Sequence, residues 1–215
     1  IAAAERLMGI SYSQDERQQM VDNLEGQIAS AIARRGVPLA NSMPMAMRFD
    51  PRLPGFAMPH GADALHLSVV TLPLPVADED IAFSTVTHLA TWIKSGALTS
   101  RRLTQIYLDR IAKIAPKLEC FAANMADQAL GEADSADALT RAGVNLGPLH
   151  GIPYGVKDLF DTKGTITGWG AEPYRDRVPD SDAAIVTRLR AAGAVLLGKT
   201  TVGALAYNDI WYGGV

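Results

Sequence analysis

A strand, a capped helix and a second, fully apolar strand follow one another near the carboxyl end of this chain, and this order limits the possible folds most. The first strand is expected over residues 151–158 in GIPYGVKD, and the second is the stretch AVLLGKT at 194–200. Ser181 and Asp182 are expected to start the helix between them, which continues through Arg190. This order predicts a βαβ unit with parallel strands and a right-handed crossover, and therefore an α/β fold.

More helices are predicted ahead of this unit. Residues 85–95 read as a short helix, and 101–115 as a longer amphipathic helix with Pro116 beyond its end. A strand-like stretch at 118–123 and an alanine-rich helix at 127–141 follow. Two helical segments ahead of an α/β half are therefore the organisation that we expect.

The first eighty residues are predicted to form a helical N-terminal extension with a proline-rich arm, separate from an α/β part at 81–215. Ser13 and Glu16 make a capping box ahead of a helix at 14–35.

The arm at 38–59 contains five prolines, so it is not expected to form a regular element. Phe49, Leu53 and Phe56 could be buried if the arm wraps around the body, and a flexible linker is the alternative.

Composition excludes several classes of function. The net charge of −3 and the pI near 5.8 offer no basic surface for nucleic acid. No apolar stretch is long enough to span a bilayer. Cys120 has no disulfide partner and is expected to be a buried structural thiol. The four histidines lack metal-ligand spacing, so no metal site is expected.

The localisation stays open. The sequence begins at Ile1 rather than methionine, so export after cleavage of a signal peptide is one alternative, and a cytoplasmic location is favoured.

Lys157 stands inside the apolar first strand of the βαβ unit. Alternation would place Ile152, Tyr154, Val156 and Asp158 on one face and Lys157 on the other. A solvated lysine at a strand end is the ordinary interpretation. A catalytic role instead requires a poorly solvated pocket, where desolvation lowers the pKa of the amine and makes it a base for a serine hydroxyl.

Three stretches carry a family resemblance: GPLHGIPYGVKDLFDTKG, DAAIVTRLRAAGAVLLGKT and GALAYNDIWYGG. Together they closely resemble the first part of the amidase signature family, over about residues 85–215. The resemblance implies a mixed sheet flanked by helices, of which only the first part is present. It also implies an amide-bond hydrolase with a Ser–cis-Ser–Lys triad and no metal or organic cofactor.

The resemblance assigns roles to several residues. Lys157 matches the catalytic lysine, which activates the serine nucleophile through the bridging cis-serine. Ala206, Tyr207 and Asn208 fall where the family's chain passes close to the reaction centre, and they are the candidate substrate-binding residues, although a packed loop is the alternative. Lys199 and His150 are interpreted as structural: Lys199 would pair with a carboxylate or cap a strand end, and His150 would be a hydrogen-bonded structural histidine.

The sequence also departs from the family pattern. The Gly/Ser-rich segment that supplies both serines is absent, so both are expected outside this chain, and the chain alone is expected to be inactive. The C-terminal remainder would come from the same or a separate polypeptide, and a homodimer is a further alternative. Gly170 lies where many relatives have a serine nearby, which would alter the substrate pocket.

Two other functions stay open. One is the A-type subunit of a tRNA-dependent amidotransferase, for which the extension is atypical and the acidic pI provides no RNA-binding surface. The other is a non-catalytic interaction module of the same fold. The substrate is expected to be a small amide whose identity the sequence does not specify.

Overall fold

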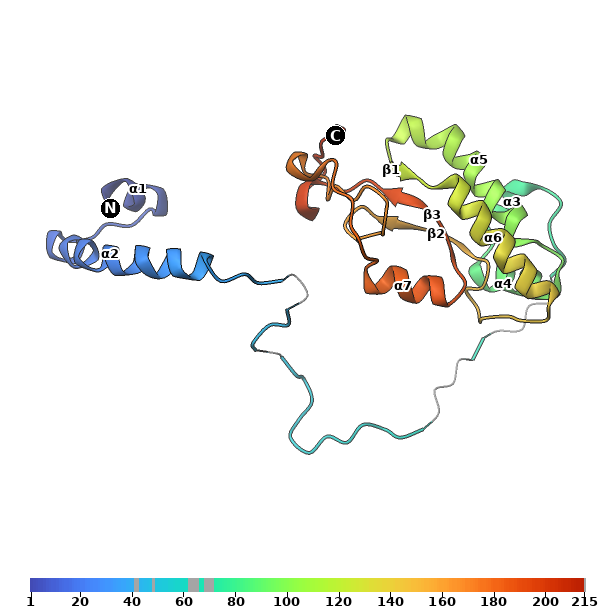
Figure 1. Ribbon diagram of the computed structural model, residues 1–215, viewed down its shortest axis with the longest axis horizontal. Helices are drawn as coiled ribbons and strands as arrows, with labels where there is room; N and C mark the ends of the chain where they lie inside the picture. Colours follow the sequence, from blue (N-terminus) through green and yellow to red (C-terminus); the bar gives the residue numbers. More distant parts are fainter. Residues whose placement is uncertain (41–42, 48, 62–65, 68–71, 215) are drawn as a thin grey trace. The chain divides into compact units, whose positions relative to one another are not determined.

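The computed structural model describes residues 1–40, 43–47, 49–61, 66–67 and 72–214 (Figure 1). They form two compact units, residues 1–62 and 63–215, which are described separately. The predicted boundary at residue 80 stays a prediction.

The first unit contains α1 (Ala2–Met8) and α2 (Gln14–Arg35). The predicted capping box is confirmed: the Ser13 hydroxyl accepts from the Glu16 amide, and the Glu16 carboxylate accepts from the Ser13 amide. The described part of the arm contains no helix or strand. Within the first unit, Phe49 is 87% exposed and Leu53 and Phe56 are exposed too, and the expected burial of these side chains against the body stays a prediction.

The helices of the second unit are α3 (Asp78–Ala82), α4 (Val86–Ser95), α5 (Ser100–Leu118), α6 (Ala126–Arg141) and α7 (Ala184–Ala191). Its strands are β1 (Phe121–Asn124), β2 (Pro153–Lys157) and β3 (Val195–Thr200), and two short 3₁₀ turns lie at Glu172–Tyr174 and Ala204–Ala206. In the described residues, no helix is both long enough and apolar enough to cross a membrane.

The three strands form one mixed sheet in the order β1-β3-β2. Strand β2 pairs with β3 in parallel, as the βαβ pattern predicts, and β1 pairs with β3 antiparallel. Val195 and Leu197 of β3 pack against α5 and α6, whereas Leu196 packs with Val156 and with Val186 of α7. Since neighbouring residues of a strand point to opposite faces, helices cover both faces (Figure 1).

A carboxylate from another helix caps the start of α5. The two oxygens of Asp137 accept from the amides of Ser100 and Arg101, at 2.7 and 3.0 Å. The Ser100 hydroxyl donates to the carbonyl of Gly151, at 2.8 Å, and so joins α5 to the turn before β2. Helices α5 and α6 are thereby joined to each other and to the turn before β2 by buried polar contacts, whereas α4 packs through apolar side chains against α5 and Ile152.

Two expected helix ends are wrong. Helix α5 continues past Pro116 to Leu118, because the proline deprives only the Ala112 carbonyl of its partner, and Ala112 is exposed to water. Helix α7 starts at Ala184, and neither Ser181 nor Asp182 caps it. The Asp182 carboxylate is instead occupied by the Lys163 amide and the Arg190 guanidinium.

Candidate functional site

The alternation predicted along β2 is confirmed. Ile152, Val156 and Asp158 are buried, whereas Gly155 and Lys157 are exposed on the other side of the strand. A register shift next to Gly155 aligns Lys157 with Thr200 across the parallel pair. Lys157 therefore ends its strand at the carboxyl edge of the sheet, where α/β proteins commonly bind ligands.

The Lys157 amine lies in a pocket of about 290 Å³ and donates to the backbone carbonyl of Thr201. Its side chain is exposed, so the poorly solvated surroundings expected for a neutral lysine base are not found in the described residues. The other residues that line the pocket are Leu118, Glu119, Thr201, Val202, Gly203, Asn208, Asp209 and Trp211.

The three predicted substrate-binding residues occupy one tight loop. Asn208 lines the pocket, whereas Ala206 and Tyr207 are not among its lining residues, and Tyr207 is 80% exposed. Ala206 and Asn208 adopt left-handed backbone angles, with φ of 63° and 64°. Such angles cost roughly 1–3 kcal/mol outside glycine and persist where the surrounding structure holds them. A Cβ on Gly203 would lie 2.0 Å from the carbonyl oxygen of Asn208, so the loop packs closely on the strand end.

Sequence reasoning missed three side chains of this pocket. Glu119 ends α5 in a left-handed conformation, with φ of 48°. Asp209 and Trp211 come from the segment directly after the predicted loop, in NDIWYGG, and this adjacency was the available signal. The pocket thus combines one amine, two carboxylates and an indole.

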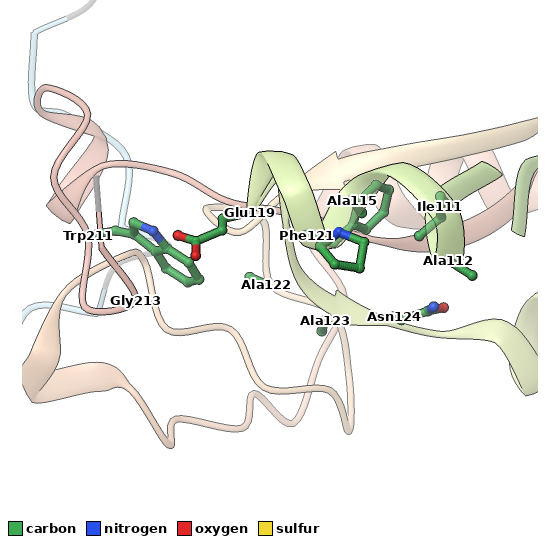
Figure 2. A pocket seen from close by; sticks show the side chains of 11 residues that line it. Ile111, Ala112, Ala115, Glu119, Phe121, Ala122, Ala123, Asn124, Trp211 and Gly213 are labelled. Atoms are coloured by element: carbon green, nitrogen blue, oxygen red, sulfur yellow. The ribbon is translucent and has the colours of Figure 1, made fainter. Parts of the chain in front are cut away.

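A neighbouring pocket of about 470 Å³ shares Glu119 and Trp211 with the first (Figure 2). Its remaining lining comes from the last turns of α5, from β1 and from Gly213. The surface beside Lys157 therefore continues into a largely apolar groove, in which the side chains of Ile111, Ala115 and Phe121 are labelled in Figure 2.

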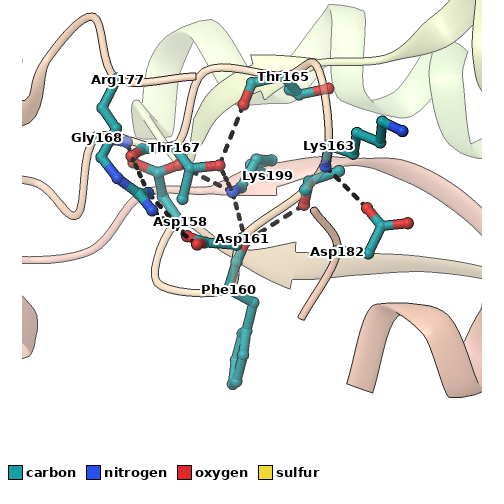
Figure 3. Close-up of polar contacts among 11 residues, drawn as sticks. Asp158, Phe160, Asp161, Lys163, Thr165, Thr167, Gly168, Arg177, Asp182 and Lys199 are labelled. Carbon is teal, nitrogen blue, oxygen red and sulfur yellow. Dashed lines mark hydrogen bonds and ion pairs between the residues drawn. The ribbon is translucent and has the colours of Figure 1, made fainter. Parts of the chain in front are cut away.

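Behind the strand lies a buried polar cluster around Lys199 (Figure 3). The Lys199 amine is 3.4 Å from the Asp158 carboxylate, and these residues are 0% and 1% exposed. Lys199 also donates to the Phe160 carbonyl, at 2.7 Å, and to the Thr167 hydroxyl. Burial lowers the pKa of Lys199, and the charge of Asp158 opposes that effect. The prediction that Lys199 pairs with a carboxylate is confirmed.

Asp158 also connects β2 to two loops. Its second oxygen accepts from the Gly168 amide, at 3.0 Å. The pKa of Tyr212 is raised by burial and then by the negative charge of Asp158, because the Tyr212 side chain reaches the same place from the pocket segment. A Cβ on Gly168 would lie 2.7 Å from the Tyr212 hydroxyl. The buried carboxylate therefore lies where the strand, the 165–170 loop and the segment after Asn208 meet.

Arg177 closes the outer side of this cluster. Its guanidinium makes two hydrogen bonds with the Asp161 carboxylate, at 2.8 and 2.7 Å, and lies 4.0 Å from the ring centroid of Trp169. Hydrogen bonding to Arg177 lowers the pKa of Asp161.

The remaining candidates have structural positions. His150 is buried and its Nε2 lies within hydrogen-bond distance of Thr140 and of the Ala136 carbonyl, so its expected structural role is confirmed. Cys120 is half-buried rather than buried, because it precedes β1 instead of lying in it. Among the described residues, no group of three or more histidine, cysteine or acidic side chains is placed to hold a metal ion.

Comparison with known sequences finds a matching family, described as Amidase, over residues 102–208. The chain is 42% identical over 134 residues to a putative amidase, AmiD, of Mycobacterium tuberculosis; the match covers 62% of this chain and 28% of that protein. It is 38% identical over 130 residues to the A-type subunit of the glutamyl-tRNA(Gln) amidotransferase of Acidothermus cellulolyticus, covering 60% and 26%. The chain thus spans about a quarter of the length of the curated relatives it matches.

Solved structures give the same picture. The native peptide amidase from Stenotrophomonas maltophilia matches with a TM-score of 0.54 and 40% identity, over 57% of this chain and 26% of that one. A fatty acid amide hydrolase matches with a TM-score of 0.55 and 28% identity, over 60% and 23%.

Proposed function

Because this chain belongs to the amidase signature family, we propose that it is the lysine-bearing N-terminal part of an enzyme that hydrolyses carboxamides. The observation that carries the proposal is the position of Lys157. Its amine lies in a pocket at the carboxyl edge of the sheet, at the end of the strand that carries the family's Val-Lys-Asp motif. Its exposed side chain remains accessible to a serine hydroxyl supplied from outside this sequence.

In the proposed reaction, the nucleophilic serine attacks the amide carbonyl while its proton passes to the bridging serine, whose own proton passes to Lys157. The amine of the substrate leaves with a proton returned along the same route, and water then hydrolyses the acyl-enzyme. The mechanism requires Lys157 to hold and release one proton, and it requires neither a metal nor an organic cofactor.

The substrate would contact the loop that follows β3. Asn208 lines the Lys157 pocket and is the strongest candidate for this contact, with Ala206 and Tyr207 beside it in the same loop. We assign the substrate to the class of small amides. The C-terminal remainder, with both serines, would belong to the same or a separate polypeptide. The proposal includes a homodimer as an alternative. It includes no nucleic-acid partner.

The test uses the full-length protein. Release of the amine from an aryl amide would be measured for the wild type, Lys157→Ala and the control Lys94→Ala, in which an exposed lysine of α4 is removed. General acid–base catalysis typically contributes 10²- to 10⁴-fold, so Lys157→Ala should lose roughly a thousandfold in kcat while the control is unchanged. Intact mass under denaturing conditions would show whether one polypeptide carries lysine and serines together. Hydrolysis that survives Lys157→Ala would refute the proposal.

The amidotransferase reading is a second candidate, favoured by the 38% identity to the Acidothermus protein. It predicts amidation of glutamyl-tRNA with glutamine or ammonia as donor, whereas the amidase proposal predicts hydrolysis without tRNA. A folded full-length protein with neither activity would favour the non-catalytic module.

A further inference from the structure

Lys199 and Asp158 form a buried ion pair directly behind the proposed base. Asp158 follows Lys157 in the sequence, and the pleat of β2 sends the carboxylate into the interior while the Lys157 amine points into the pocket. Lys199 reaches the same carboxylate from β3, at 3.4 Å.

A buried ion pair is energetically less favourable than apolar side chains that would fill the same space. Removing two charges from water costs more than burying apolar side chains of similar volume, and such pairs are often neutral or unfavourable for stability. Strand packing alone therefore gives little reason for a lysine with no exposed surface. Asp158 by contrast has contacts that explain it, because it accepts from the Gly168 amide and lies beside Tyr212.

We propose that Lys199 is a positioning residue for the reaction: it neutralises the buried carboxylate of Asp158, so that the neighbouring amine of Lys157 does not gain a strong counter-charge. The inference rests on the proposed role of Lys157 as the base. A base must lose its proton at the working pH, and a nearby anion favours the ammonium form. With Lys199 in place, Asp158 can hold the loops together without that effect.

Other charged groups surround the two lysines and stay in place in the variants below. Glu119 and Asp209 line the pocket of Lys157. Asp161 and Arg177, which are paired with each other, are near Lys199, and Tyr212 is beside Asp158. The single variants remove the charge of Lys199 together with its hydrogen bonds to Phe160 and Thr167. The double variant also lacks those bonds but has no unpaired carboxylate, so the comparison of single and double variants isolates the charge.

The experiment compares the full-length wild type with Lys199→Met, Lys199→Gln and the double variant Asp158→Asn/Lys199→Met. The glutamine keeps a donor for the Phe160 carbonyl or the Thr167 hydroxyl, so it serves if the methionine variant does not fold. Two quantities are measured against pH: kcat/KM, and the rate at which trace acetic anhydride labels Lys157, read by peptide mass spectrometry.

Both single variants should move the Lys157 labelling curve and the rising limb of kcat/KM to higher pH than in the wild type. The double variant, which has no charge at either position, should return both curves to the wild-type position. A purely structural role would lower stability and activity in the single variants without moving either curve, and that result would overturn the proposal. The labelling curve does not depend on turnover, so it tests the inference even if Lys157→Ala shows the proposed hydrolysis to be wrong.

Discussion

The side chains of the consecutive residues Lys157 and Asp158 point to opposite sides of the sheet at the end of β2. The Lys157 amine is exposed and donates to the Thr201 carbonyl, whereas the Asp158 carboxylate is buried beside Lys199 and accepts from the Gly168 amide. The backbone of the strand therefore separates the proposed reaction site at Lys157 from the buried ion pair of Asp158 and Lys199. The cap of α5 by Asp137, the close contact at Gly170 and the Asp161–Arg177 pair allow predictions that do not depend on the reaction.

Asp137 should stabilise the fold through its capping of α5. Replacing it by alanine leaves the Ser100 amide buried without its acceptor, so we expect the free energy of unfolding to fall by about 2 kcal/mol. The control is Asp134→Ala, which removes an exposed pair with Arg101 and should change the value by less than about 0.5 kcal/mol. Urea unfolding of the two variants measures the difference, and equal effects would contradict the capping role.

Gly170 should tolerate no side chain. Its φ is 67°, and a Cβ would lie 2.0 Å from the carbonyl oxygen of Val202, at the close contact between the 168–170 turn and the loop after β3. Gly164 has a similar φ of 73° with nothing within 4 Å of a Cβ, so it isolates the cost of the backbone angle. Gly164→Ala should lose about 1 kcal/mol and Gly170→Ala clearly more, because backbone must move. Thermal unfolding of the two variants measures the difference. Similar midpoints would contradict the prediction, because they would show that the loop after β3 moves at little energetic cost.

The Asp161–Arg177 pair should make stability depend on pH in the acidic range. Because hydrogen bonding to Arg177 lowers the pKa of Asp161 in the folded state, the pair stabilises the protein fully above the unfolded pKa of about 3.9. That contribution is lost as the pH falls through the lower, folded pKa. Asp161→Asn should cost about 1 kcal/mol at pH 7 and progressively less below pH 4. Unfolding by urea at pH 7, 5 and 3 measures this, and a gap that stays constant would contradict it.

Much of the fold could be read from local patterns. The capping box at Ser13 and the apolar run of β3 predicted their elements because caps and hydrophobic periodicity act within a few residues. The error at Pro116 arose because the carbonyl freed by the proline, that of Ala112, is exposed to water, whereas the error at Ser181 arose where the local signal competed with contacts made elsewhere. Asp182 has partners from two other segments, so it is not available as a cap.

The sequence by itself determined the βαβ unit and the alternation that exposes Lys157. It also determined the family to which the chain belongs. Only the tertiary structure decided which side chains meet behind that lysine. Strict alternation along β3 would place Lys199 on the face of Val195 and Leu197, but the register shift between β2 and β3 aligns Lys199 with Val156 instead. A shift of this kind depends on two strands separated by a helix and two loops, and no pattern within either strand encodes it.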